Sequence, residues 1–469
     1  MRVRYFLDPF GCAKNQVDAE NMMAHLDGAG WSAAADADAA DLIIVNSCGF
    51  IESAKQESIN AVLLWRKRWP GKKILLAGCL SYRYADELAG ALPEADLIFG
   101  GADPAEIVDA AARCCGLTAA RKERAGKPAA SARPLLSLPG SAYVKISEGC
   151  DNRCSFCAIP LIRGGLRSRP VGDIVEECRG LLLRGVKELC IIGQDIGSFR
   201  SGGAAGLDGT ISGLPALLEA IAALEGRFWV RLLYIHPDHF PLGILDIMER
   251  DGRFLPYFDI PFQHASPKIL SAMNRRGTAE SGLALLETIR ARLPAAVIRS
   301  TFLLGFPGET DEDFARLLDF QERARVDWLG CFTYSREEGT AAYTMKGRVS
   351  KKTALERKRI IEERQVSITE RNMDRFVGKT LDVLIEEQFE NPAAGDGAFD
   401  DGESLWLGRL YCQAPEVDGA AVIVCAEPEL RGKTGAKPRP GAWASGKITA
   451  RRGFDLELRF LENDGFMGQ

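Results

Sequence analysis

The sequence of 469 residues contains no apolar run that approaches the roughly 18 residues needed to span a bilayer, so a membrane protein is not expected. Its first residues, MRVRYFLDPFGCAKNQ, include neither a long apolar core nor a small-residue cleavage site, which favours a cytoplasmic protein over a secreted one. Positive charge is not in excess either. The net charge of −5 and the pI near 5.7 argue against a surface that binds polyanions over its whole extent. A local basic patch is compatible with this overall charge.

Histidine is scarce, and no nucleophilic triad is offered by the four residues His25, His236, His239 and His264. Cysteine, by contrast, occurs 13 times. An odd number of cysteines in a reducing compartment argues against disulfides and favours metal or redox chemistry. Seven cysteines lie in helix-like or strand-like patterns without ligand spacing, and we interpret them as packing thiols: Cys114, Cys115, Cys178, Cys190, Cys331, Cys412 and Cys425.

The hydrophobic pattern predicts an α/β multidomain fold. Residues 1–115 alternate apolar runs with helical patterns, which is typical of a parallel sheet covered by helices. Residues 116–140, rich in Ala, Pro and basic side chains, are predicted to be a linker. Residues 141–375 contain six further strand and helix pairs, enough for a partial TIM-like (β/α)6 barrel. Residues 376–469 hold five short β-like runs, which predict a small β-barrel of the OB-like kind.

Three cysteines of the first domain, Cys12, Cys48 and Cys79, each come directly after a predicted strand. Ligands of open parallel sheets bind at the carboxyl ends of the strands, so these thiols are expected to meet at one edge. We interpret them as one metal site. The alternative is three half-buried thiols that act as small hydrophobic side chains.

A second group of three lies in KISEGCDNRCSFCAIPLIRGG, where Cys150, Cys154 and Cys157 follow the first predicted barrel strand in a CxxxCxxC spacing. A structural zinc site normally has four protein ligands, and no fourth Cys or His follows closely. Three thiolates on an iron-sulfur cubane would leave one iron open to a substrate or cofactor. Zinc with a remote fourth ligand remains the alternative.

This loop resembles the radical S-adenosylmethionine (SAM) superfamily, and Phe156 fits the same pattern. Further motifs, GCAKNQVDAEN, NSCGFIESAKQES, AGCLSYRY, YFDIPFQHAS, GFPGETDEDF and YSREEGTAA, resemble the methylthiotransferase family within it, and the last domain is similar to that family's TRAM barrel. The sequence departs from the family pattern at Ala13, where proline is usual, in LDPFG and in YIHPDHF, but no ligand is lost.

The resemblance implies two 4Fe-4S clusters. An auxiliary cluster would be held by Cys12, Cys48 and Cys79, and a second cluster, held by Cys150, Cys154 and Cys157, would bind SAM and cleave it to a 5'-deoxyadenosyl radical. The family's auxiliary cluster is thought to carry the sulfur that is methylated and transferred. A cellular electron donor such as flavodoxin or ferredoxin is implied as a partner.

The motifs GCAKNQVDAE, CGFIESAKQES, SEGC and GRLYCQAPEVDG resemble the RimO type of this family more closely than the type that modifies a transfer RNA adenosine. RimO-type members modify the β-carbon of an aspartate in small-subunit ribosomal protein S-twelve. Between Lys379 and Cys425, ten acidic residues stand against Lys379 and Arg409, which suits a basic protein better than a phosphate backbone. The basic residues that follow are numerous enough for a local contact with RNA: Arg431, Lys433, Lys437, Arg439, Lys447, Arg451 and Arg452.

Whether the protein meets its substrate free or in the ribosome is open at this point. So is the substrate class, since a transfer RNA methylthiotransferase remains an alternative. An alternative of another kind is a non-catalytic iron-sulfur protein that binds the ribosome.

Four residues are candidates for contacts with SAM in addition to Phe156. Gly305 and Gly308 follow the fifth predicted barrel strand, where absent side chains would let backbone approach the cofactor, although a plain glycine turn is the alternative. Gln194 and Asp195 follow the second strand and are expected to make polar contacts with cofactor or substrate, or to cap the loop. No side chain is assigned as a catalytic acid, base or nucleophile.

Overall fold

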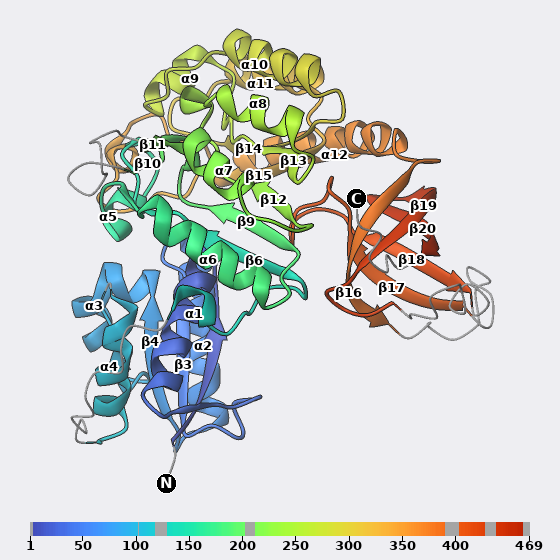
Figure 1. Ribbon diagram of the computed structural model, residues 1–469. Coiled ribbons are helices and arrows are strands. Elements are labelled where there is room, and N and C mark those ends of the chain that lie inside the picture. Colours follow the sequence, from blue (N-terminus) through green and yellow to red (C-terminus); the bar gives the residue numbers. More distant parts are fainter. Residues whose placement is uncertain are drawn as a thin grey trace.

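The computed structural model describes residues 3–101, 103–117, 129–201, 212–389, 403–426 and 438–462. Figure 1 shows an N-terminal domain below a central domain, with a C-terminal β-barrel beside the central one. In the described part of the chain, no helix is long and apolar enough to cross a membrane.

The N-terminal domain is built on a parallel sheet with the strand order β2-β1-β3-β4-β5. Its strands are β1 (Arg4–Pro9), β2 (Ser32–Ala33), β3 (Leu42–Ser47), β4 (Lys73–Gly78) and β5 (Leu97–Ile98). Its helices are α1 (Ala13–Gly28), α2 (Glu52–Arg68), α3 (Cys79–Ala91) and α4 (Ile107–Cys114). All of β3 is buried, because helices pack on both faces of the sheet. The predicted parallel α/β domain is confirmed, and only the two-residue β2 was not expected.

The central domain contains the predicted six-stranded parallel sheet, in the order β15-β14-β13-β12-β9-β6. The strands are β6 (Ser141–Lys145), β9 (Glu188–Ile192), β12 (Trp229–Leu232), β13 (Phe254–Asp259), β14 (Val297–Leu304) and β15 (Trp328–Thr333). The helices between and after them are α5 (Ile159–Arg163), α6 (Val171–Leu183), α7 (Leu214–Ala222), α8 (Gly243–Arg250), α9 (Pro267–Ala272), α10 (Ala279–Arg292), α11 (Asp311–Ala324) and α12 (Lys351–Asp374). The short pairs β7 (Ser147–Glu148) with β8 (Arg167–Ser168), and β10 (Arg200–Ser201) with β11 (Ser212–Gly213), lie outside the main sheet. The arrangement is the partial barrel that the sequence predicts.

The C-terminal domain is a closed barrel in the order β16-β17-β18-β20-β19. All five of its strands were predicted: β16 (Thr380–Phe389), β17 (Glu403–Arg409), β18 (Ala421–Ala426), β19 (Trp443–Arg452) and β20 (Asp455–Glu462). The segment 410–420, between β17 and β18, packs on the face of the central sheet that the helices leave open. Apolar residues of the two domains therefore form one shared core.

The described part of the predicted linker, residues 129–140, is fixed to both neighbouring domains. It contains a 3-10 turn, η2 (Ala130–Ala132), followed by the fully buried Arg133. The guanidinium of Arg133 donates to Glu20 of α1 at 2.8 Å and also pairs with Glu177 of α6. Residues 118–128 lie outside the described residues.

Of the seven predicted packing cysteines, six are buried and Cys115 is half-buried. This agrees with a role as small hydrophobic side chains.

Candidate functional site

The three cysteines of the N-terminal domain lie where three adjacent parallel strands end. Cys12 is the N-cap of α1, Cys48 directly follows β3, and Cys79 is the first residue of α3. The loops approach one another closely. A Cβ on Gly11 would lie 3.4 Å from the Sγ of Cys48, and a Cβ on Gly49 would lie 2.7 Å from the carbonyl oxygen of Cys79. The sequence prediction that these thiols share one sheet edge is therefore matched by the backbone geometry. We call Cys12, Cys48 and Cys79 the N-terminal trio.

The thiols of the N-terminal trio influence one another. Burial raises the pKa of Cys48 to about 11, and the neighbouring Cys79 and Cys12 add to the effect. Burial also raises the pKa of Cys79, against the opposing charge of Arg163. Enclosure pushes the pKa of Cys12 upward too, but the charge of Lys14 and the backbone N–H groups at the start of α1 outweigh it and leave the pKa low. Binding of metal would therefore have to release protons from Cys48 and Cys79.

Asn15 ties the loops of this trio together, a role that sequence reasoning missed. Its buried side-chain amide donates to the carbonyl oxygens of Phe10 at 2.6 Å and of Ser47 at 3.2 Å. Its Oδ1 lies 3.7 Å from the Sγ of Cys79. The signal in the sequence is its place three residues after Cys12, which puts it in the first turn of α1.

The CxxxCxxC loop lies at the carboxyl end of β6 and is fastened from several sides. Asn152 donates to Asp195 at 2.9 Å. The backbone N–H and the hydroxyl of Ser155 donate to the carbonyl oxygens of Met273 and Ala272 at the end of α9. Arg153 has a left-handed φ of 50°, a conformation that persists in a non-glycine residue only where the surroundings hold it. The positions of the three thiols are thus set by the barrel. We call Cys150, Cys154 and Cys157 the barrel trio.

Burial raises the pKa of Cys150 to about 11 and that of Cys157 to about 12, and the neighbouring Cys154 contributes to both shifts. Burial, reinforced by the charge of Arg275, lowers the pKa of His236 to about 3, so this imidazole is neutral. Its Nδ1 accepts the N–H of Asp238, which leaves the proton on Nε2, 4.0 Å from the Sγ of Cys154. His236 therefore presents a donor, not a metal-ligating lone pair, to the barrel trio.

The donor chemistry of each trio fits a cubane cluster, because three thiolates bind three of its irons and leave the fourth iron open. Among the described residues, no three Cys, His, Asp or Glu side chains are grouped as ligands of one metal ion. Gln194 donates to Glu148, two residues before Cys150, and its buried Oε1 has no hydrogen-bond partner in the described part of the chain. Because a buried polar atom without a partner costs free energy, this amide is suited to a polar ligand such as SAM.

The other predicted SAM residues differ in their surroundings. Asp195 is buried, caps the 3-10 turn η3 (Ile196–Ser198) and accepts the backbone N–H of His236, so its oxygens are occupied by protein donors. Phe156 packs against the apolar cluster of Ile269 and Phe306. The proposed roles of both residues in cofactor binding remain predictions.

The glycine loop after β14 is held by its own Glu309. The carboxylate of Glu309 accepts the N–H of Gly305 at 2.7 Å, and Arg357 of α12 donates to it at 2.6 Å. Gly305 has a φ of 75°, and a Cβ there would lie 2.5 Å from the Cβ of Ala354. Gly308 has a φ of 85° with open space around it. Close packing against α12 therefore accounts for Gly305, whereas Gly308 leaves room for a ligand.

Arg163, at the end of α5, reaches from the segment after the barrel trio to the N-terminal trio. Its Nη2 lies 2.9 Å from the Sγ of Cys79, and its Nη1 lies 2.6 Å from Asp18 and 3.5 Å from Glu148. Glu148 stands two residues before Cys150 and also pairs with Lys145. Arg163 was part of the quoted cysteine loop, but its reach into the N-terminal domain depends on how the domains dock. A second link joins Arg83 of α3 to Glu337 at 2.7 Å.

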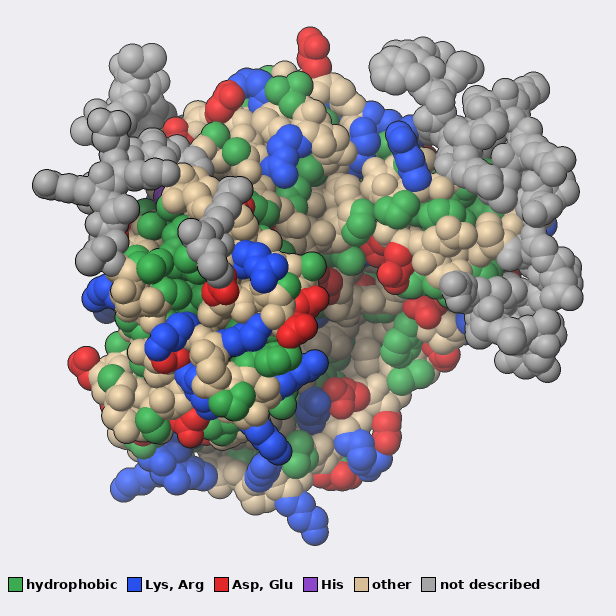
Figure 2. Space-filling model, turned by 90° about the horizontal axis from the view of Figure 1, so that it is seen from below, with side chains coloured by type: hydrophobic (Ala, Val, Ile, Leu, Met, Phe, Trp, Pro, Cys, Tyr) green, Lys and Arg blue, Asp and Glu red, His purple; other side chains and the backbone are tan. Residues whose placement is uncertain are grey.

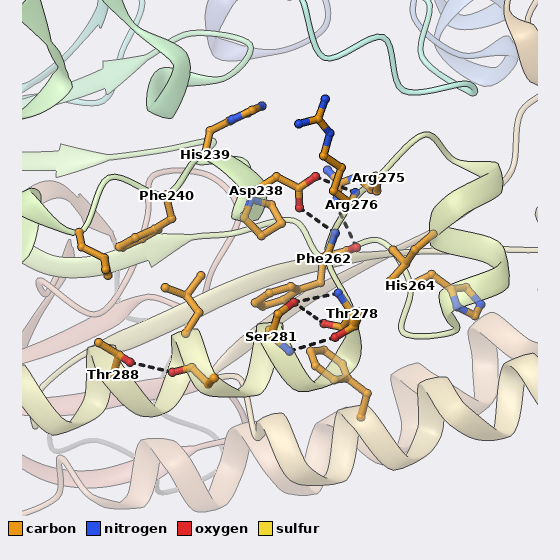
Figure 3. Close-up of a pocket in the computed structure, with 18 residues that line it drawn as sticks. Asp238, His239, Phe240, Phe262, His264, Arg275, Arg276, Thr278, Ser281 and Thr288 are labelled. Atoms are coloured by element: carbon orange, nitrogen blue, oxygen red, sulfur yellow. Dashed lines mark hydrogen bonds between the residues drawn. The ribbon is translucent and has the colours of Figure 1, made fainter.

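Two hollows lie near this region. A cavity of about 540 Å³ runs between the turn η4 (Pro237–His239) and α10, and includes Phe262, His264 and Arg275 in its wall (Figure 3). Asp238 closes one end by accepting the N–H groups of Arg276 and Gly277, as the dashed lines in Figure 3 mark. No residue of either trio lines this cavity. A smaller hollow of about 200 Å³ is lined by Asn152, His236 and Asn274, among others, and is adjacent to the barrel trio.

Three family models match the chain: an uncharacterized protein family, UPF0004, over residues 4–100, the radical SAM superfamily over residues 144–320, and the TRAM domain over residues 377–460. The chain is 47% identical to ribosomal protein uS12 methylthiotransferase RimO of Treponema denticola, over 96% of this chain and 99% of that protein. It is 38% identical to the protein of the same name from Thermotoga maritima, over 90% and 94% of the two chains.

Among solved structures, the radical SAM methyltransferase TsrM of Kitasatospora setae, with cobalamin and a [4Fe-4S] cluster bound, aligns with a TM-score of 0.52. The alignment covers 73% of this chain and 77% of that one at 16% sequence identity, so it supports the fold alone.

Proposed function

The chain belongs to the RimO family of radical SAM methylthiotransferases, and from this premise we propose that it adds a methylthio group to the β-carbon of an aspartate in ribosomal protein uS12. The observation that carries the proposal is the position of Arg163, which follows the barrel trio in sequence and contacts the N-terminal trio in space. The helix that follows the barrel trio thus brings a guanidinium into contact with a thiol of the N-terminal trio.

The proposal assigns a 4Fe-4S cluster to each trio and SAM to the barrel trio. When bound, these groups would supply hydrogen abstraction from an unactivated carbon and the sulfur and methyl group that are transferred. The chain positions them: Asn15 fixes the loops of the N-terminal trio, and Ser155 fixes the barrel trio to α9. The proposed surroundings of SAM are Gln194, Gly308, Phe156, Asp195 and Gly305.

A protein substrate is favoured over transfer RNA. Figure 2 shows Lys, Arg, Asp and Glu side chains interspersed on the face seen from below, without a broad field of one sign. Two of the basic residues that favoured a local RNA contact are paired: Arg451 with Asp374 at 2.7 Å, and Arg452 with Glu457 at 2.6 Å. Arg431, Lys433 and Lys437 lie outside the described residues. The proposal keeps a local RNA contact for Arg439 and Lys447 in the assembled ribosome.

The proposal also includes an electron donor, a cellular compartment and the bounds of the domains. A flavodoxin or ferredoxin supplies electrons, and the reaction takes place in the cytoplasm. We also assign residues 1–115 to the auxiliary-cluster domain, 141–375 to the radical SAM barrel and 376–469 to the TRAM barrel, with 116–140 between the first two.

The test is to reconstitute the full chain with iron and sulfide under anaerobic conditions and to incubate it, with SAM and a reductant, with uS12 and separately with transfer RNA. Mass spectrometry should find a methylthio group on an aspartate of uS12. Modification of transfer RNA alone would overturn the substrate assignment. Failure to cleave SAM at all would favour a non-catalytic iron-sulfur protein.

A further inference from the structure

A lysine of the N-terminal domain extends to the open face of the central sheet. Lys14 is the second residue of α1, two residues after Cys12. Its Nζ lies 3.3 Å from the centroid of the Tyr234 ring, just beyond the end of β12. The N-terminal trio and the interior of the central domain therefore meet at this side chain.

Tyr234 is held in place by an unusual backbone conformation. Its φ is 68°, which is uncommon for a bulky side chain, and its N–H donates to Asp259 at 3.3 Å. Strain of this kind persists where the surroundings impose it, often at ligand sites. The aromatic face is thereby kept against the ammonium group of Lys14.

Lys14 has no carboxylate within 4 Å among the described residues, unlike the cations around it. Lys145 and Arg163 both pair with Asp18, and Arg299 faces Asp418 at 4.0 Å. A ligand carboxylate would therefore form an ion pair with this ammonium group without displacing a carboxylate of the protein.

We propose that Lys14 binds the side-chain carboxylate of the substrate aspartate. The inference rests on the proposed function and adds the residue that recognises the substrate. The β-carbon of an aspartate is bonded directly to its carboxylate carbon, so a carboxylate held by Lys14 places the reacting carbon beside Cys12 and the N-terminal trio. Tyr234 forms the floor of this subsite and keeps the ammonium pointed at the substrate. An uncharged asparagine at the same position would not form the ion pair.

The experiment compares the wild type with K14M, which keeps the length of the side chain and removes its charge, and with K14R, which keeps the charge. Each reconstituted full-length protein is given a uS12 peptide with the target aspartate, and the same peptide with asparagine in its place. The exposed Lys352 of α12 supplies a matched control, K352M. Iron per chain and SAM cleavage without peptide are measured for all four proteins.

We expect K14M to raise the KM for the aspartate peptide at least tenfold and to lower the preference for aspartate over asparagine at least tenfold. K14R should retain part of that preference, and K352M all of it. SAM cleavage should stay at the wild-type level in every variant, and K14R, which keeps the charge beside Cys12, should also keep the iron content. An unchanged preference in K14M would overturn the proposal, as would a loss of iron or of SAM cleavage in both K14M and K14R, since Lys14 would then serve the cluster or the fold. A wild type that modifies transfer RNA and not the peptide would instead overturn the proposed function, and this inference with it.

Discussion

Glu188 at the start of β9 and Arg409 at the end of β17 form an ion pair, with 2.6 Å between Oε2 and Nη2, and neither side chain is more than 3% exposed. The second oxygen of Glu188 accepts from Arg231 at 2.7 Å, and Arg231 also donates to the carbonyl oxygen of Tyr411 at 2.8 Å. The central domain and the C-terminal barrel are therefore joined by charges that water does not reach.

E188Q should weaken this junction. Breaking a buried ion pair leaves Arg409 and Arg231 without full compensation, at a cost of about 3–5 kcal/mol in the free energy of unfolding at pH 7. Urea unfolding followed by tryptophan fluorescence is a suitable measurement, because Trp229 and Trp443 pack edge to face across the same junction, with 4.4 Å between their ring centroids. E249Q, which alters an exposed pair with Arg292, is the control and should unfold like the wild type.

The same pair predicts a pH dependence. Arg409 and Arg231 outweigh the effect of burial and lower the pKa of Glu188 to about 2, below its unfolded value of about 4.3. The stabilisation is therefore complete above the unfolded pKa and is lost as the pH falls from about 4.3 towards 2. The difference in unfolding free energy between wild type and E188Q should shrink across this window. A difference that stays constant from pH 7 to pH 3 would contradict the assignment.

Replacement of single cysteines should separate the two trios. C79A and C150A are each expected to lose about half of the iron bound after reconstitution, because the proposed function assigns one of two equal clusters to each trio. C150A should also lose SAM cleavage, whereas C79A should retain it. Iron analysis and detection of 5'-deoxyadenosine are the measurements. C115A, which alters a half-buried cysteine outside both trios, should keep all of the iron.

Loss of Arg163 should change the electronic properties of the N-terminal cluster. A charged donor 2.9 Å from the Sγ of Cys79 stabilises added negative charge, so R163M should shift the midpoint potential of that cluster to a lower value. The redox titration is followed by EPR in a variant that lacks the cysteines of the barrel trio, so that the signal comes from the N-terminal cluster alone. R83M removes the contact with Glu337 between the same domains and does not touch sulfur. An equal shift in both variants would mean that docking, not the contact with sulfur, sets the potential.

Two glycines of one loop should respond differently to alanine. Both have positive φ, which costs a side chain about 1–2 kcal/mol. In G305A the new methyl group also meets Ala354 at 2.5 Å, which adds about 1–3 kcal/mol of overpacking, whereas Gly308 has open space. Urea unfolding should therefore rank G305A below G308A in stability. The reverse order would show that the loop does not pack against α12 in solution.

Much of the fold follows from local patterns in the sequence. The apolar runs that predicted six barrel strands and five C-terminal strands are long enough to specify strands without tertiary context. The N-terminal trio was predicted because thiols after parallel strands share a sheet edge, and the barrel trio was predicted from its CxxxCxxC spacing after the first barrel strand. β2, with two residues, is too short to leave a periodic pattern.

The remaining features of the site arise from contacts between domains, which periodicity does not encode. Arg163 belongs to a quoted motif, but its partner Cys79 is 84 residues away in another domain. Lys14 is next to a predicted ligand, yet its contact with Tyr234 depends on how α1 docks on β6. Asp195 was expected to contact a ligand or cap its loop, and its oxygens are engaged by the cap and by neighbouring donors.

The segment 410–420, which reaches from the C-terminal barrel onto the open face of the central sheet, has an evolutionary consequence. Tyr257 donates to Asp418 at 2.6 Å, and Trp328 donates to the carbonyl oxygen of Cys412 at 2.8 Å. The sheet therefore carries hydrogen-bond donors that are positioned for this particular segment. A TRAM barrel taken from an unrelated protein would leave these two donors without acceptors and the carboxylate of Glu188 without Arg409. Exchange of either domain would therefore require matching changes in the other.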